Sequence, residues 1–366
     1  MGRLGYIRAL DGIRGVAIAV VVGTHYFGVP GNGALGVDLF FVLSGFLITT
    51  LLLEERRRTG RISFARFYGR RARRLLPALV LVLGAFLAVD AIRHTDGLRV
   101  VALYGLYFGN AYQAFWHARS DPLTGLNHLW SLAEEEQFYV VWPLAMIVLT
   151  RVRSPFRWLV GLAACLALYR AVLVFGLHAP SARVYLGPDT RADGLVLGSA
   201  LAFWRFTGKS LPDRSRLPLL AVAVGGLLLL MSPTITFAAL WLPVFECAAV
   251  VVVLAATGDN VVARALSVRP LVWLGAISYS LYLWHPVVIW TLHRQHRALA
   301  LGIAIAFSYA STRWIEQPLR RYRRSRPAPP ASVAPQQVVI RTDGGAAPSS
   351  ESVAPLGRRA GAESLA

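Results

Sequence analysis

Long apolar runs, separated by short polar or arginine-rich stretches, make up most of residues 8–318. A helix needs about 18 or more apolar residues to cross the hydrocarbon core of a bilayer. We therefore predict an all-α fold, a polytopic transmembrane helix bundle of about ten spans. The expected spans are 8–28, 35–53, 75–92, 128–150, 157–176, 193–206, 217–231, 235–256, 271–291 and 299–318. Residues 98–115 are a candidate for an extra interfacial or re-entrant helix.

Composition supports a membrane protein. Of the 366 residues, 55% are hydrophobic and only 16% are charged, whereas soluble chains carry about 25% charged residues. The net charge of +19 comes almost wholly from arginine, because Lys209 is the single lysine. In a membrane protein, clusters of arginine mark the loops on one side of the bilayer. We therefore expect a lipid bilayer and not nucleic acid as its partner.

The basic residues orient the predicted bundle. Residues 54–74 hold nine arginines against two glutamates. Counting alternate loops from there, residues 151–157, residues 205–216 and the run RRYRRSR after the last span fall on the same side. Loops rich in Arg and Lys stay in the cytoplasm. We therefore expect both termini to be cytoplasmic.

The chain divides into two expected parts. Residues 1–326 are predicted to form the transmembrane domain. Residues 327–366 are rich in Pro, Ala and Ser and have no apolar helix face, which predicts a disordered cytoplasmic tail. Cys165 and Cys247 both fall in apolar segments, so we expect neither a disulfide nor a metal site.

Two ionisable residues lie inside the first apolar segment. Arg14 and His25 are eleven residues apart, which places them on one helix face about 16 Å apart along the axis. Ionisable groups inside a span are costly and are usually functional. The alternative is that Arg14 extends to the headgroups and His25 is a hydrogen-bonded core histidine.

An arginine cluster precedes the third predicted span. Arg70 and Arg73, like Arg71 and Arg74, are i, i+3 pairs that lie close on a helix surface. Paired guanidinium groups suit polyphosphates or carboxylates. The alternative is that the cluster meets anionic lipid headgroups.

A second set of polar groups is expected to converge in the outer half of the bundle. A carboxylate that orients an imidazole lets it act as a general base near neutral pH. The alternative is a hydrated interfacial belt. The set comprises His25, Asp38, His128, Glu134, Glu135, Glu136, Asp193 and His285.

The chain resembles the acyltransferase 3 family of bacterial membrane O-acyltransferases. The resemblance covers about residues 5–325 and rests on seven segments in family order. These are YIRALDGIRGVAIAVVVGTHY, GALGVDLFFVLSGFLIT, FARFYGRRARRLLPAL, LNHLWSLAEEEQFYVVWP, ADGLVLGSALA, ISYSLYLWHPVVI and RWIEQPLRR. The family's arginine–histidine pair maps onto Arg14 and His25, and its paired-arginine motif onto Arg71 and Arg74, with a register ambiguous by one residue.

The resemblance implies a multi-pass protein of the bacterial inner or plasma membrane. It would transfer an acyl group, often acetyl, from cytoplasmic acyl-CoA to a hydroxyl of a carbohydrate or glycosylated metabolite. Acyl-CoA would be a donor substrate, with no tightly bound cofactor. Some relatives carry a C-terminal extracytoplasmic hydrolase-like domain that completes the transfer, and we do not expect such a domain in residues 327–366. We therefore expect this chain to act directly on its acceptor or to pass the acyl group to a separate extracytoplasmic protein.

Roles follow from the resemblance and from depth in the bundle. We expect the coenzyme A phosphates to meet Arg14, Arg70, Arg71, Arg73 and Arg74. Catalytic roles are expected for His25, Arg14, Glu135 and Asp38, with His25 as general base or transient acyl carrier. Acceptor-binding roles are expected for His128, Trp130, Glu134, Tyr282 and His285. The oxyanion stabiliser stays open between Arg14, Tyr282 and backbone amides.

A transporter or permease for a polar solute is the alternative function, because ionisable residues inside spans also mark transport pathways. No repeat relates two halves of the sequence, and the arginine cluster lies at one surface only. Both observations favour the enzyme.

Overall fold

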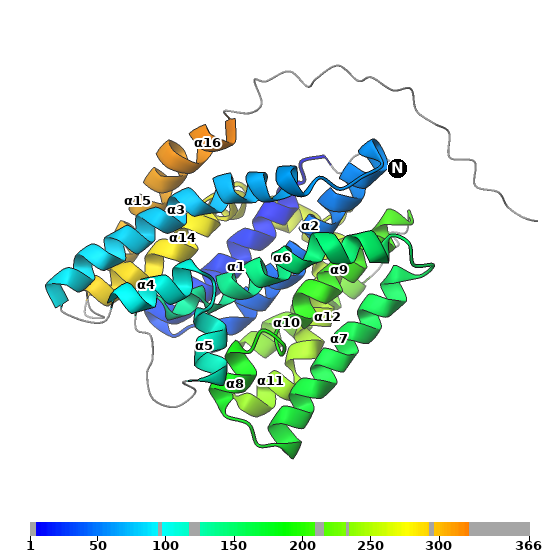
Figure 1. Cartoon of the computed structure of the whole chain (residues 1–366), viewed down its shortest axis with the longest axis horizontal. Coiled ribbons are helices and arrows are strands. Elements are labelled where there is room, and N and C mark those ends of the chain that lie inside the picture. Colours follow the sequence, from blue (N-terminus) through cyan, green and yellow to red (C-terminus); the bar gives the residue numbers. More distant parts are fainter. Residues whose placement is uncertain are drawn as a thin grey trace, which may run out of the picture. The chain divides into compact units, whose positions relative to one another are not determined.

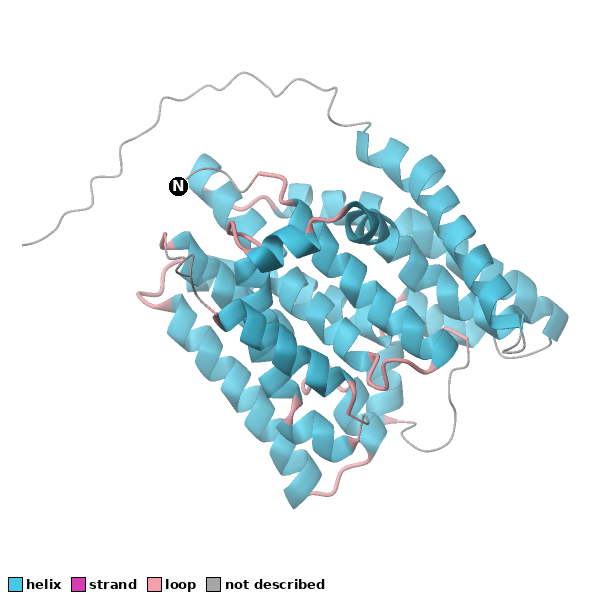
Figure 2. Ribbon diagram, turned by 180° about the vertical axis from the view of Figure 1, so that it is seen from behind, coloured by secondary structure: helices cyan, strands magenta, loops and turns pink. Residues whose placement is uncertain are grey.

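The described residues are helices joined by short loops, with no strand among them (Figure 2). The computed structural model describes residues 5–93, 97–116, 125–208, 216–231, 234–292 and 296–321. They all belong to one compact unit, residues 1–325. The expected tail, residues 327–366, lies outside the described residues. The all-helical prediction is confirmed for the described part of the chain.

The first two helices form a hairpin that carries most of the candidate site. α1 (Arg8–Phe27) runs through the middle of the bundle (Figure 1). α2 (Ala34–Thr59) returns along it and ends at Gly60, whose φ of 72° is the left-handed conformation that closes many helices. The chain then enters α3 (Phe64–Arg93).

The arginine-rich stretch is therefore mostly helical and not the loop expected at residues 54–74. Only residues 60–63 separate α2 from α3. Arginine is a good helix former, so a basic sequence continues a helix beyond its apolar part. As a result the paired arginines occupy fixed positions on α3.

The remaining helices follow in short steps. The expected segment 98–115 forms two short helices, and the expected span 235–256 divides at Trp241, because Pro243 begins a new helix well but breaks an existing one. The elements are α4 (Gly97–Gly105), α5 (Gly109–Phe115), η1 (Asn127–Leu129), α6 (Trp130–Leu149), α7 (Pro155–Ala171), η2 (Val172–Gly176), α8 (Ser181–Leu186), α9 (Asp193–Phe206), α10 (Leu217–Leu229), α11 (Ile235–Leu240), α12 (Leu242–Ala255), α13 (Val261–Leu266), α14 (Arg269–Leu292), α15 (Arg297–Ala310), η4 (Ser311–Glu316) and α16 (Gln317–Arg321).

Glycines let two pairs of helices touch through their backbones. A Cβ at Gly275 of α14 would lie 1.8 Å from the carbonyl oxygen of Asp11 on α1. A Cβ at Gly198 of α9 would lie 2.0 Å from the carbonyl oxygen of Val42 on α2. Small residues at helix contacts allow this approach in membranes. The α1–α14 contact places His25 beside the second half of α14.

Six helical segments among the described residues are long and apolar enough to cross a membrane. They are residues 8–27, 34–59, 64–92, 155–176, 269–292 and 297–319. α10 and α12 are apolar but shorter. The chain is therefore a multi-pass membrane protein, while the number of ten spans and the orientation of the termini stay predictions.

The α1–α2 hairpin has two ends with different character. At the end that holds the N-terminus, Arg56 of α2 hydrogen-bonds Thr150 after α6, and the guanidinium of Arg57 lies 6.0 Å from the ring centre of Phe206 in α9. We call this the arginine end. At the opposite end, residues of α8 and α11 line a common cavity with the first turn of α2.

Candidate active site

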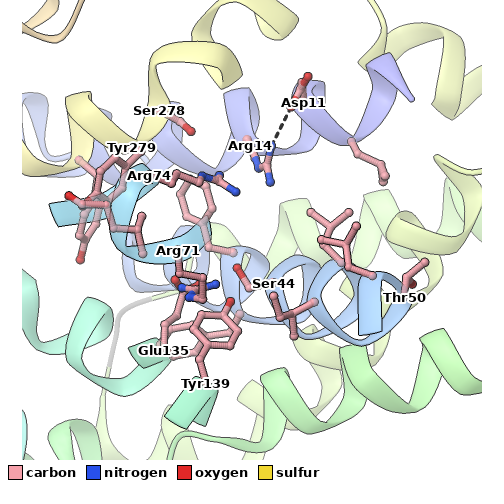
Figure 3. Close-up of a pocket in the computed structure, with 18 of the residues that line it drawn as sticks. Asp11, Arg14, Ser44, Thr50, Arg71, Arg74, Glu135, Tyr139, Ser278 and Tyr279 are labelled. Carbon is pink, nitrogen blue, oxygen red and sulfur yellow. Dashed lines mark hydrogen bonds and ion pairs between the residues drawn. The ribbon is translucent and has the colours of Figure 1, made fainter. Parts of the chain in front are cut away.

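A cavity of about 580 Å³ opens between α1, α2, α3, α6 and α14. We call it the arginine cavity, because the side chains of Arg14, Arg71 and Arg74 lie around it (Figure 3). It extends from residues 5–7, at the arginine end, to Ser131 and Tyr282. Its lining comprises Gly5, Tyr6, Ile7, Leu10, Asp11, Arg14, Val37, Phe40, Phe41, Ser44, Leu47, Ile48, Thr50, Leu51, Glu54, Arg71, Arg74, Leu75, Ser131, Leu132, Glu135, Tyr139, Ser278, Tyr279 and Tyr282.

Ion pairs hold two of these guanidinium groups in place. Arg14 Nη1 lies 2.8 Å from Asp11 Oδ1. Arg71 donates to Glu136 Oε1 and stacks on Tyr139, with its guanidinium carbon 3.5 Å from the ring centre. These contacts fix donors before a ligand arrives, which lowers the entropy cost of binding.

The cavity is not strongly positive as a whole. Three carboxylates, those of Asp11, Glu54 and Glu135, line it beside the three guanidinium groups. The cavity therefore offers paired, oriented hydrogen-bond donors and not a broad field of positive charge.

The two arginine pairs of α3 have different surroundings. Arg71 and Arg74 line the cavity. Arg70 Nη2 instead lies 3.2 Å from Glu55 Oε2, and its side chain is 49% exposed. Arg70 and Arg73 are not among the described residues that line the cavity. Of the two pairs, Arg71 and Arg74 are therefore the one positioned to meet a ligand in the cavity, while the register of the motif stays a prediction.

Beyond the inner end of the cavity, the expected histidines meet. His25 Nδ1 lies 2.8 Å from His285 Nε2. His285 Nδ1 lies 2.9 Å from the carbonyl oxygen of Leu281, which can only accept, so Nδ1 carries the proton. Neutral His285 then accepts at Nε2, and His25 donates from Nδ1. This pattern leaves the lone pair of His25 on Nε2, which makes that atom the basic one.

His128 and Tyr282 complete this histidine cluster. The ring centres of His128 and His285 are 5.7 Å apart. The hydroxyl of Tyr282 donates to the carbonyl oxygen of His128 at 2.5 Å and lies 2.5 Å from Ser131 Oγ. The Tyr282 ring also lies 5.8 Å from that of His285 and lines the arginine cavity. Tyr282 therefore stands between the lining of the arginine cavity and the three histidines.

The two histidines that pair across α1 and α14 differ in exposure. His285 is completely buried, whereas His25 is exposed at the far end of α1. A buried imidazole thus orients an accessible one. The neighbour that fixes the tautomer of His25 is a histidine, where the sequence had suggested a carboxylate.

The expected acidic residues do not join the histidines. Glu134 accepts from Asn110 Nδ2 at 3.3 Å. Glu135 lines the arginine cavity, and Glu136 pairs with Arg71. Consecutive residues of a helix are rotated by about 100°, so these three carboxylates point to three different surroundings.

Asp38 and Trp130 belong to a neighbouring group of charges and rings. Asp38 Oδ1 lies 2.6 Å from Arg191 Nη2, and the ring of Trp130 lies 4.9 Å from that of Tyr185. Asp193 lies 2.7 Å from Arg170. Sequence reasoning missed both arginines. Arg170 was detectable as an ionisable residue inside an apolar segment, whereas Arg191 stands in a polar stretch without such a signal.

Comparisons with known proteins show the family of this chain. Residues 7–312 match the family described as the acyltransferase domain. The chain is 32% identical over 349 residues to the putative peptidoglycan O-acetyltransferase YrhL of Bacillus subtilis (strain 168), which covers 86% of this chain and 55% of that protein. It is also 32% identical, over 353 residues, to the peptidoglycan O-acetyltransferase OatA of Listeria monocytogenes, covering 86% and 56%.

A putative O-acetyltransferase of Staphylococcus aureus (strain COL) is 30% identical over 362 residues, covering 87% of this chain and 58% of that protein. The chain thus spans little more than half the length of these curated relatives. No solved structure matches it significantly. The family match includes the three arginines of the arginine cavity and all three histidines of the cluster, and this chain belongs to the acyltransferase 3 family.

Proposed function

We propose that this protein transfers an acyl group, namely acetyl, from acyl-CoA to a hydroxyl group of a carbohydrate or glycosylated metabolite. One observation carries the proposal: the arginine cavity reaches Tyr282, and the Tyr282 ring contacts that of His285, which is hydrogen-bonded to His25. Donor groups for an anion and a general base would thus stand at the two ends of one path.

The donor would enter at the arginine end. Its phosphates would meet Arg14, Arg71 and Arg74, whose N–H groups form strong hydrogen bonds to phosphate oxygens. Arg14 and His25 are separated by about 16 Å along α1, which is comparable to an extended pantetheine arm. The thioester would then approach the histidine cluster once the Tyr282 ring turns aside.

His25 would act on the acceptor hydroxyl. Its Nε2 takes the hydroxyl proton while the oxygen attacks the thioester carbonyl carbon. The new C–O ester bond forms, the C–S bond breaks, and the proton passes from His25 to the departing thiolate. A route in which His25 briefly carries the acyl group gives the same products.

The relatives suggest the class of acceptor. Two of them are named as O-acetyltransferases of peptidoglycan, which is a carbohydrate polymer. We carry over the coarser class, a hydroxyl of a saccharide, to this chain. We propose the cytoplasmic side for the donor, because the last turn of α2 is rich in arginine and Glu54, at the same end of that helix, lines the arginine cavity.

The test uses the purified full chain in nanodiscs with acetyl-CoA labelled in the acetyl group. We expect binding of acetyl-CoA, slow release of free CoA without acceptor, and faster release with label in an ester when a saccharide is added. A transporter has no reason to cleave a thioester. Movement of a solute across sealed vesicles without cleavage of any acyl-CoA would replace the proposal with the permease alternative.

A further inference from the structure

A second cavity, of about 310 Å³, lies at the opposite end of the α1–α2 hairpin from the arginine end. We call it the outer cavity. It is enclosed by the first turns of α2 and α6 and by α8, α11 and α12. Its lining includes the polar side chains of Asn32, Asp38, Asn127 and Arg191.

Polar atoms in this lining are left without partners. Asn32 is only 1% exposed, yet neither its Oδ1 nor its Nδ2 has a hydrogen-bond partner among the described residues. The same holds within the described structure for Asp38 Oδ2 and Arg191 Nε, although these two residues pair with each other through other atoms. A buried polar group without a partner costs free energy, so such groups point to a ligand that satisfies them.

The unpartnered atoms include donors and acceptors side by side. Nδ2 of Asn32 and Nε of Arg191 donate, whereas Oδ1 of Asn32 and Oδ2 of Asp38 accept. A hydroxyl group both donates and accepts, so a ring that carries several hydroxyls matches this mixture. Trp130, Tyr185 and Phe237 add aromatic surface, which suits the apolar C–H faces of a sugar ring.

One short segment connects the outer cavity to the reaction path. Within residues 127–131, Asn127 and Trp130 line the outer cavity, while Ser131 lines the arginine cavity. Between them, His128 belongs to the histidine cluster through its contact with His285. A ligand held by Asn127 and Trp130 is therefore next to the cluster that would take its proton.

We propose that the outer cavity binds one neutral, hydroxyl-rich sugar ring of the acceptor. The proposal rests on the acyl transfer proposed above. The volume lies at the lower end of the range of about 300–1,000 Å³ for small-molecule sites, which fits a single ring with the rest of a larger acceptor outside.

Charge favours a neutral sugar over an acidic one. The guanidinium of Arg191 is already ion-paired with Asp38 and lies over the rings of Trp130 and Tyr185, at 5.5 and 5.1 Å from their centres. A sugar carboxylate would meet the unpartnered oxygen of Asp38 without a spare cation from this pair. Burying that second negative charge is costly.

Direct binding tests the proposal without relying on acyl transfer. Saturation-transfer NMR on the full chain in nanodiscs would use N-acetylglucosamine, glucose and maltose as probes, with glucuronate as the acidic comparison. We expect signal transfer to at least one neutral probe and little to glucuronate. Asn32→Leu keeps a side chain of similar size but removes the amide. Asn32→Ala is used if the Leu variant does not fold. Each should weaken binding about tenfold or more, as expected for losing a buried hydrogen-bonding group.

Ser308→Ala is the matched control, because Ser308 is buried but bonds only the Ala304 carbonyl of its own helix among the described residues. It should bind the neutral probe like the parent. Binding that is unaltered by both Asn32 variants, transfer to glucuronate alone, or transfer to no neutral probe would each overturn the inference. Sugar binding that depends on Asn32, without any cleavage of acetyl-CoA, would instead retain the sugar site and overturn the proposed function.

Discussion

His25 and His285 lie with their rings nearly parallel, 15° apart with centres separated by 5.1 Å, and share a hydrogen bond of 2.8 Å from Nδ1 to Nε2. The two residues are 260 positions apart in the chain. The backbone of α14 fixes the proton on His285, and His285 in turn fixes the proton on His25. The orientation of the proposed base is therefore set by a helix on which the base does not lie.

We expect His25→Ala to retain a folded, membrane-inserted protein and to lose acyl transfer by about 100- to 10,000-fold, the usual effect of removing a general base. The measurement is ester formation from labelled acetyl-CoA by the purified variant. Near-normal transfer at normal expression would refute the assignment of His25.

His285 is predicted to be a positioning residue. His285→Phe keeps a ring in the site but removes the acceptor for His25 Nδ1, and we expect kcat to fall by up to about 100-fold with KM for acyl-CoA nearly constant. His285→Gln restores an acceptor oxygen and should recover part of kcat. A structural role alone would make both variants equally inactive or equally unstable, so recovery by Gln is the decisive readout.

The arginine cavity predicts a split between the two arginine pairs of α3. Replacing Arg71 and Arg74 by Gln should raise KM for acyl-CoA about tenfold or more, because hydrogen bonds to charged groups are worth about 1.5–3 kcal/mol each. Replacing Arg70 and Arg73 by Gln should have a much smaller effect. Titration of acyl-CoA at saturating acceptor measures both. An equal effect of the two replacements would contradict the register.

Helix contact predicts a difference between two glycines. Gly275→Ala places a methyl group where the carbonyl oxygen of Asp11 lies, which should cost about 1–3 kcal/mol of stability through overpacking. Gly302→Ala is the control, because a Cβ there meets nothing within 4 Å. It should be neutral or slightly stabilising. Thermal unfolding in detergent compares the two, and equal melting temperatures would show that α1 and α14 are not in such close contact.

The sequence predicted α1 well because the geometry of a single helix depends on neighbouring residues in the chain. An apolar run predicts its bounds, and a rise of 1.5 Å per residue places Arg14 and His25 along it. The six segments able to cross a membrane all overlap expected spans. Helix length in a basic segment was less predictable, since hydropathy changes at the membrane surface whereas the helix of α3 continues through Arg71 and Arg74.

Pairs formed between segments far apart in the chain were beyond prediction from one sequence. Asp38 meets Arg191 across 153 positions, and no local pattern gives that distance. The sorting of Glu134, Glu135 and Glu136 depends on how α6 is rotated against its neighbours. The rotation of α6 about its axis is set by packing against its neighbours, and the spacing of polar residues alone does not predict it. Trp130, expected near the histidines, faces the outer cavity for the same reason.

Arg14 and His25 share one uninterrupted helix, so the length between them is set by backbone geometry and not by how helices pack. An inserted alanine between Val20 and Val21 would lengthen this segment by only about 1.5 Å but would rotate His25 about 100° away from α14. The rotation of His25 about the axis of α1 therefore matters more than the length of the helix. A chain with that insertion would keep the proposed donor site and lose the proposed base. The register of α1 therefore couples the two ends of the proposed path.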